Sequence, residues 1–245
     1  HAPGLIQHLP QRLAAIESLG IEATLVLPFD EAMSQIPAEM FIQGLYVDLG
    51  RIQSICVGAH FAFGHQRQGN VELLQRLGQE MNFIVHGLAS ISLDDETVSS
   101  TRIRQAIETG QLDAAGQMLG REYALTGEVI QGDQRGRELG YPTANLEVDG
   151  LCLPPNGVYA AHAQVGETTH RAAVNIGLRP TIADAEPSLH VEAHLLDFEG
   201  DLYGQPLALT FVGKLRDETK FDSLDTLKTQ IEKDLVSARY LFTQL

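Results

Sequence analysis

Apolar residues in the first half of the chain follow helical and strand-like spacings in turn. Leu13, Ile16 and Leu19 recur at helical intervals before Gly20, and residues 23–28 (ATLVLP) form a short apolar run typical of a buried strand. Helices alternating with short apolar strands predict a parallel sheet with crossover helices. The further helices are predicted at residues 38–49, 71–81, 101–109 and 112–119, and the further strands at residues 54–58 and 83–85.

The pattern changes after Gly120, where short strand-like segments are separated by Gly, Pro and Asn. Closely spaced strands of this kind predict a small antiparallel barrel or sandwich. Apolar residues at roughly helical intervals over residues 223–242 predict one long helix at the end. We therefore expect an α/β domain at residues 1–120 and an all-β domain at residues 121–245. The strands of the second domain are predicted at residues 124–131, 157–165, 169–176, 190–196 and 207–215.

Composition argues against several classes of protein. The 245 residues include 32 acidic and 17 basic side chains, and a net charge of −15 would repel nucleic acid. Cys56 and Cys152 belong to no spacing typical of a metal or redox pair, which favours a reducing cytoplasm. No apolar run approaches the roughly 20 residues that cross a bilayer, and the first residues lack the pattern of a signal peptide. We expect a soluble, cytoplasmic protein without nucleic-acid or membrane partners, and the pattern does not indicate an oligomeric state.

A glycine-rich stretch at residues 127–145 (GEVIQGDQRGRELGYPTAN) is a candidate phosphate-binding loop. Its glycines let backbone N–H groups approach a polyanion, and Arg137 adds charge-assisted hydrogen bonds. No GKS or GKT follows, so the stretch is not a Walker A loop, and on the glycines alone a flexible hairpin loop is the better interpretation. Thr143 and Asn145 lie two residues apart, so in an extended backbone their oxygens share one face and suit Mg²⁺. An ordinary turn with an Asn–backbone hydrogen bond is the alternative.

Residues 98–104 (VSSTRIR) place hydroxyl side chains at the predicted start of a helix, followed by Arg102 and Arg104. Unpaired N–H groups and the helix dipole both favour an anion at such a position. An ordinary helix cap followed by two surface arginines accounts for the same residues equally well.

Five ordered segments of the second half resemble the riboflavin kinase family. Their order and spacing agree along the whole second half. The resemblance implies a six-stranded antiparallel barrel with a C-terminal helix, using ATP and Mg²⁺. The segments are residues 127–145, 153–161 (LPPNGVYAA), 174–181 (VNIGLRPT), 191–204 (VEAHLLDFEGDLYG) and 211–231 (FVGKLRDETKFDSLDTLKTQI).

The resemblance also implies roles for individual residues in phosphoryl transfer. Thr143 and Asn145 match the residues that hold Mg²⁺ and the nucleotide phosphates. Gly132 and Arg137 match the loop that covers those phosphates. Glu192 matches the carboxylate that accepts the proton of the riboflavin 5′-hydroxyl, and only the family match distinguishes it from the other acidic residues.

Two further residues match family positions near the flavin, Arg216 and Phe221. Their chemistry suits a planar heteroaromatic ligand through stacking and polar contacts. A surface charge and a core anchor are the alternative interpretations. Asp197, Asp201 and Tyr203 are expected to build a turn between strands.

The first half resembles the FMN adenylyltransferase domain of bacterial bifunctional FAD synthetases. Residues 98–104 are similar to the second signature of the nucleotidyltransferase superfamily, and residues 57–70 (VGAHFAFGHQRQGN) are similar to a neighbouring segment. The resemblance implies a doubly wound, Rossmann-like domain. The residues implied for phosphate binding are Ser99, Ser100, Thr101 and Arg104.

The first half departs from that family in two ways. No HxGH-type first signature occurs in these residues, and neither His60 nor the Gly64–His65 pair has its spacing. In addition, Ala59 and His60 stand where the family commonly has an acidic pair. We expect an incomplete doubly wound sheet without its opening strand and first helix. The full-length protein is then expected to be an FAD synthetase, and this stretch alone to be poor at adenylyl transfer.

The leading hypothesis is ATP-dependent phosphorylation of riboflavin to FMN with Mg²⁺, joined in the intact protein to adenylylation of FMN to FAD. A catalytically silent flavin-binding or regulatory protein is the main alternative. Such a protein would not require Thr143, Asn145 and Glu192 together. An adenylyltransferase with a purely structural barrel is the third possibility.

Overall fold

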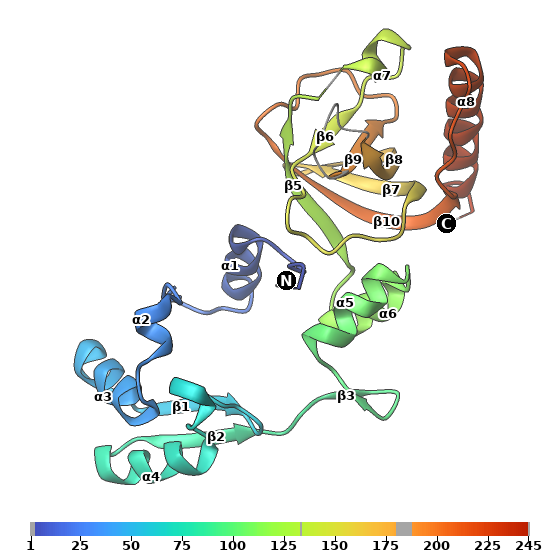
Figure 1. The fold of residues 1–245 in the computed structure, drawn as a ribbon. Coiled ribbons are helices and arrows are strands. Elements are labelled where there is room, and N and C mark those ends of the chain that lie inside the picture. Colours follow the sequence, from blue (N-terminus) through green and yellow to red (C-terminus); the bar gives the residue numbers. More distant parts are fainter. Residues whose placement is uncertain (1–2, 133, 180–187, 245) are drawn as a thin grey trace. The chain divides into compact units, whose positions relative to one another are not determined.

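The computed structural model describes residues 3–132, 134–179 and 188–244 (Figure 1). The chain divides into two compact units. One, the α/β unit, spans Ile21–Val98, and the other, the barrel unit, joins the segment that ends at Gly20 to the chain from Ser99 onward. The expected boundary between residues 120 and 121 lies inside the barrel unit. Compactness reflects packing and does not test the limits of a sequence family, so that boundary stays a prediction.

The α/β unit is built on two parallel strands. β1 (Ser54–Gly58) pairs in register with β2 (Ile84–Leu88), and α4 (Val71–Met81) connects them. Asn70 begins α4 by accepting the N–H of Leu73, which satisfies one of the open donors of the first turn. A parallel strand pair with a connecting helix confirms the predicted α/β pattern.

The core of the α/β unit lies where its helices pack against the strands. Leu74 and Leu77 of α4 are at most 1 % exposed and pack with Ile42 of α3 (Ala38–Leu49) and with Phe83. The bounds of α3, β1 and α4 agree with the predicted ranges. The other elements of this unit are α2 (Glu31–Ser34), the short 3-10 turn at His65–Arg67, and the two-stranded hairpin of β3 (Ser92–Leu93) and β4 (Glu96–Thr97).

The strand predicted at residues 23–28 is wrong. This segment has no strand structure, and Leu25, Val26 and Leu27 are 61 %, 50 % and 43 % exposed. An apolar run becomes a strand only when a neighbouring strand pairs with its backbone groups. In the described part of the chain the parallel sheet consists of β1 and β2 alone, and neither pairs with this run.

Six strands of the barrel unit form a closed barrel in the order β10-β5-β6-β9-β8-β7, with every neighbouring pair antiparallel. Alternate residues of these strands point inward, and Leu125, Val174, Val191 and Leu209 are at most 2 % exposed in the core. Closure into a barrel decides between the two predicted all-β architectures. The strands are β5 (Ala124–Ile130), β6 (Ala144–Leu146), β7 (Gly157–Val165), β8 (Thr168–Arg179), β9 (Ser188–Leu195) and β10 (Pro206–Arg216).

The last helix, α8 (Leu224–Leu241), packs against the outside of the barrel (Figure 1). Ser223 begins the helix with a capping box shared with Thr226. Ala238 of α8 packs on Ala160 of β7 and Ala173 of β8, and these small side chains let helix and sheet approach closely. The predicted C-terminal helix is therefore confirmed.

The shorter helices of the barrel unit are α1 (Leu9–Glu17), α5 (Ser100–Glu108), α6 (Leu112–Leu119) and α7 (Arg135–Glu138). Polar contacts tie the start of the chain to the rest of this unit. The side-chain amide of Gln11 donates to the carbonyl of Thr126 at 2.6 Å, and the N–H of Leu5 donates to the carbonyl of Gly150 at 2.7 Å. No helix in the described ranges is both long and apolar enough to cross a membrane.

The two cysteines should differ sharply in reactivity. Cys152 is 4 % exposed, and burial together with the neighbouring carboxylate of Glu108 raises the pKa of its thiol to about 12. Cys56 in β1 is exposed. Because the thiolate is the nucleophile, iodoacetamide at about pH 8 should label Cys56 in the native protein and Cys152 only after unfolding. Mass spectrometry of native and denatured samples checks this, and equal native labelling of both thiols would contradict it.

Candidate functional site

Two cavities on the barrel unit share Gln134 and Thr143. The helix cavity has a volume of about 330 Å³ and lies between the outer face of β8 and β9, the segment after β10, and α8. The loop cavity has a volume of about 430 Å³ and lies between α7 (Arg135–Glu138), the start of β6 and the segment after β9. Both are of the size that small-molecule sites commonly have. Two cavities with a common wall can hold two substrates next to each other.

The lining of the helix cavity combines an apolar wall with a few charged groups. Phe221 and the α8 residues Leu227, Ile231 and Leu235 supply apolar surface. Its charged and polar lining consists of Gln134, Tyr141, Thr143, Asn175, His190, Glu192, His194, Arg216, Glu218, Thr219 and Asp234. A mostly apolar cleft with a few placed polar groups suits a planar organic ligand.

Thr143 and Asn145 lie on one face of the chain, as their spacing predicts. Ala144 and Leu146 point into the barrel core, whereas Thr143 and Asn145 are half-buried on the opposite face. Asn145 pairs in register with Glu192 of β9. A hydroxyl, an amide and a carboxylate therefore come together from segments almost fifty residues apart.

Glu192 has a second neighbour across the sheet, because Asn175 of β8 is its register partner on the other side. Both Glu192 and Asn175 line the helix cavity, together with Thr143. A carboxylate at the wall of a ligand-sized cavity, beside a hydroxyl and amides, is placed to accept a proton from a bound molecule.

Glycine is required at two positions of the glycine-rich stretch because its backbone packs closely against residues 141–145. A Cβ on Gly132 would lie 2.6 Å from Oδ1 of Asn145. A Cβ on Gly136 would lie 2.5 Å from the carbonyl oxygen of Tyr141 and 3.1 Å from Oγ1 of Thr143. The stretch is thus held against Thr143 and Asn145, which argues against the alternative of an unattached hairpin loop. Arg137 lines the loop cavity.

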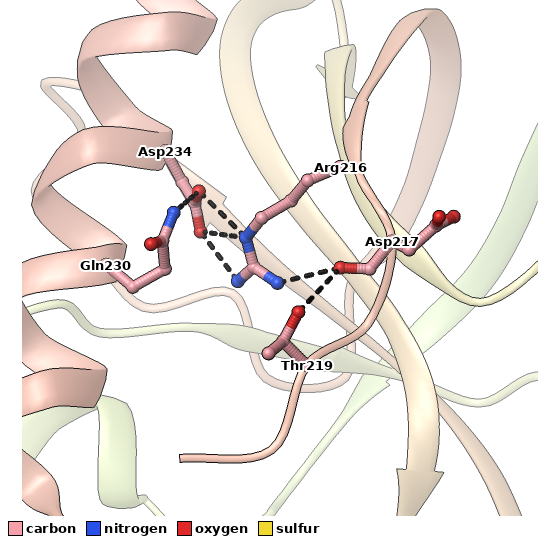
Figure 2. Close-up of polar contacts among 5 residues, drawn as sticks. All are labelled: Arg216, Asp217, Thr219, Gln230 and Asp234. Atoms are coloured by element: carbon pink, nitrogen blue, oxygen red, sulfur yellow. Dashed lines mark hydrogen bonds and ion pairs between the residues drawn. The ribbon is translucent and has the colours of Figure 1, made fainter.

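The guanidinium group of Arg216 is held by the carboxylate of Asp234 (Figure 2). Its Nε donates to both carboxylate oxygens at 2.9 and 3.1 Å, and its Nη2 donates at 2.8 Å. Nη1 donates to the carbonyl of Asp217 at 2.9 Å, and Gln230 donates to the same carboxylate at 2.8 Å. The guanidinium also lies over the ring of Phe221, 5.6 Å from its centre. The structure therefore brings the two predicted flavin-side residues together, with Arg216 in an ion pair rather than at an open surface.

Several residues near the site were missed by reasoning from the sequence. The pattern along the sequence indicated no role for Asp234 of α8 or for His194 of β9. His194 donates from Nδ1 to the carbonyl of Pro142 at 2.8 Å, which holds the segment that leads into Thr143. Asp201 accepts the N–H of Tyr203 at 3.0 Å, as the predicted turn requires, yet both residues also line the loop cavity. Periodicity cannot find such residues, because their neighbours come from other strands.

The predicted phosphate-binding residues of the first half lie elsewhere in the barrel unit, at the start of α5. Ser99 caps this helix by accepting the N–H of Arg102 at 3.3 Å, and Ser100 and Thr101 are exposed in its first turn. Arg104 donates from Nε to the carbonyl of Gly4 at 2.6 Å. None of these residues lines the helix cavity or the loop cavity.

Known protein families match both the first and the second half of the chain. The family model described as riboflavin kinase matches residues 119–242, and the one described as FAD synthetase matches residues 1–102. A protein of Pseudomonas fluorescens named bifunctional riboflavin kinase/FMN adenylyltransferase is 36 % identical over 233 residues, which are 95 % of this chain and 75 % of that protein. A protein of the same name from Escherichia coli (strain K12) is 36 % identical over 242 residues, 98 % of this chain and 77 % of that protein.

A solved structure from Streptococcus pneumoniae, described as a macrolide-efflux protein, superposes with a TM-score of 0.78 and 30 % sequence identity. The match covers 96 % of this chain and 75 % of that one. Sequence and fold therefore agree over nearly the whole length of the chain. By the two family models and the extent of these relatives, the chain belongs to the family of bifunctional riboflavin kinases/FMN adenylyltransferases.

Proposed function

We propose that the barrel unit transfers the γ-phosphate of ATP to the 5′-hydroxyl of riboflavin and so forms FMN. The observation that carries this proposal is the meeting of the helix cavity and the loop cavity at Thr143, with Glu192 lining the helix cavity. Phosphoryl transfer is mostly positioning and charge neutralisation, and it needs donor and acceptor in line beside one group that takes the hydroxyl proton. Two adjoining cavities with a carboxylate in one of them meet that need.

The helix cavity is the acceptor side of the reaction. Glu192 lies in its wall and accepts the proton of the ribityl hydroxyl as that oxygen attacks phosphorus. Phe221 and the guanidinium of Arg216 supply flat surfaces on which the flavin ring stacks. The apolar residues of α8 exclude water from the ring.

The loop cavity is the donor side and takes the nucleotide. Arg137 in its wall neutralises phosphate charge, and Phe198 and Tyr203 offer aromatic surface for a base. Gly132 and Gly136 bring the backbone close to Thr143 and Asn145. In this proposal the γ-phosphoryl group is transferred next to these residues. Thr143, common to both cavities, thus stands at the point of transfer.

The oxygens of Thr143 and Asn145 fit the magnesium ion that we propose to accompany ATP. Both are neutral and half-buried on one face, and Mg²⁺ takes few protein ligands because it keeps several waters and binds nucleotide phosphates. In the described ranges no group of three or more His, Cys, Asp or Glu side chains is placed to hold a metal by itself. When bound, Mg²⁺ neutralises charge on the transferring phosphoryl group.

We propose that the full-length protein has a second activity, the adenylylation of FMN to FAD. The match of residues 1–102 to FAD synthetase supports this proposal. The first turn of α5 with Ser99, Ser100 and Thr101 is the candidate phosphate-binding element, since a helix N-terminus favours an anion. Arg104 is the proposed cationic partner from the same helix.

The kinase proposal predicts that purified protein with Mg²⁺ and ATP converts riboflavin to FMN, and chromatography of the flavins measures the conversion. The alternative of a silent flavin binder predicts no FMN and riboflavin binding that does not depend on Mg²⁺-nucleotide. Flavin fluorescence titrations with and without Mg²⁺-ADP separate the two. Absence of FMN together with nucleotide-independent riboflavin binding would refute the kinase proposal.

A further inference from the structure

Asp234 is the one buried charged or polar side chain among the residues that the structure describes, at 6 % exposure. It lies on α8 and is one of the residues that line the helix cavity. Burying a carboxylate removes its hydration and is unfavourable unless every oxygen finds a partner. Here Arg216 donates to both oxygens and Gln230 donates to one of them. An apolar residue would pack at this helix position with less cost, so packing alone does not explain the carboxylate.

Asp234 also determines how Arg216 is presented. The carboxylate takes the edge formed by Nε and Nη2, and the carbonyl of Asp217 takes Nη1, as Figure 2 shows. A guanidinium held by its edge has a fixed plane. That plane lies over the ring of Phe221, 5.6 Å from its centre. The ion pair therefore fixes two flat groups of the cavity wall relative to α8.

The segment that follows β10 carries two more residues of the helix cavity, Glu218 and Thr219. Thr219 donates to the carbonyl of Asp217 at 3.4 Å, and Glu218 accepts from the side chain of Asn156 at 2.9 Å. The segment after β10 is thus joined to α8 through Arg216 and to the barrel through Glu218. Loss of the Asp234 carboxylate would release the α8 side of this segment.

We infer that Asp234 is a positioning residue for riboflavin: it acts through Arg216 to hold the segment after β10 in the geometry that receives the flavin ring. This inference rests on the assignment of the helix cavity to riboflavin under the proposed function. It assigns no contact between Asp234 and the reacting atoms. Its effect therefore falls on riboflavin binding and leaves the nucleotide side unchanged.

The test is Asp234→Asn, which keeps the shape of the side chain and removes its charge. The KM for riboflavin should rise about tenfold or more, while the KM for ATP stays within about twofold of the wild type, since small misplacements of a binding group weaken only the contacts that it makes. Asp197→Asn is the matched control. It breaks another two-bond ion pair to α8, between Asp197 and Arg239, which is exposed and outside both cavities. Asp197→Asn should leave both KM values unchanged.

Two further variants keep the test decisive if Asp234→Asn folds poorly. Asp234→Glu retains the charge and displaces it, and it should raise the KM for riboflavin to a smaller extent. The double variant Arg216→Lys with Asp234→Asn should bind riboflavin no more weakly than Arg216→Lys alone, because Asp234 acts only through the arginine. Multiplying effects in the double variant, equal rises in both KM values, or a wild-type KM for riboflavin in Asp234→Asn would each overturn the inference.

The outcome remains separate from that of the proposed function. If the wild type makes no FMN, the kinase proposal fails, and flavin fluorescence still compares riboflavin affinity between the wild type and Asp234→Asn. A drop in affinity of about tenfold in that titration would support the positioning role. Equal affinities would overturn it.

Discussion

Replacement of Glu192 by Gln should lower the rate of FMN formation by about 10²- to 10⁴-fold, the range that a positioned general base contributes. The amide has nearly the shape of the carboxylate but cannot take the proton of the attacking hydroxyl. Because Glu192 lines the cavity without making up its apolar wall, the KM for riboflavin should change little. Initial rates of FMN formation at saturating ATP measure the effect.

The control for this variant is Glu128→Gln. Glu128 is an exposed glutamate on β5, outside both cavities, so the same chemical change there should leave the rate near that of the wild type. If Glu192→Gln keeps more than about a tenth of the wild-type rate, the role of Glu192 as the proton acceptor is wrong. Loss of activity in both variants would point to a general effect of the substitution on the barrel.

Removal of either proposed magnesium ligand should have the second-largest effect. Asn145→Ala and Thr143→Val each delete one oxygen from the half-buried face that Thr143 and Asn145 share, opposite the barrel core. We expect the Mg²⁺ concentration for half-maximal activity to rise by about 10- to 100-fold or more. Loss of a residue that only supports a metal ligand already weakens metal binding by about that factor, and loss of a ligand itself should weaken it at least as much. Titration of the kinase rate with MgCl₂ at fixed ATP measures this shift.

Thr210→Val is the matched control for the loss of a hydroxyl from a barrel strand. Thr210 lies on β10 between the core residues Leu209 and Phe211, and it lines neither cavity. Its Mg²⁺ dependence should equal that of the wild type. An unchanged Mg²⁺ dependence in both Asn145→Ala and Thr143→Val would remove the two residues from the metal site, even if the rate itself fell.

Much of the fold follows from local pattern. The helices α3, α4 and α6 and the strands β1 and β7 have the bounds that their apolar spacing predicts. In α4, for example, the buried residues Leu74 and Leu77 lie on one stripe of the helix, so the residues of the segment itself carry the signal. The run at residues 23–28 fails for the opposite reason, because a strand needs a partner that its own sequence does not contain.

In the candidate site, too, some positions follow from local spacing and others depend on the pairing of distant strands. The shared face of Thr143 and Asn145 is a property of extended backbone and could be predicted from their spacing. The position of Glu192 opposite Asn145 could not, since it depends on the pairing of β6 with β9. Resemblance to a family singled out Glu192, and its role there stays a prediction that the Gln variant tests.

By itself, the sequence determined many of the helices and strands and which stretch is rich enough in glycine to lie against other backbone, because these properties depend on neighbours along the chain. The six-stranded barrel was implied by the family resemblance, whereas tertiary structure alone decided that two cavities meet at Thr143. It also decided that Asp234, one of 32 acidic residues, becomes the buried partner of Arg216. The physical reason is that burial and ion pairing are set by groups from distant segments, and only the folded chain brings them within hydrogen-bonding distance.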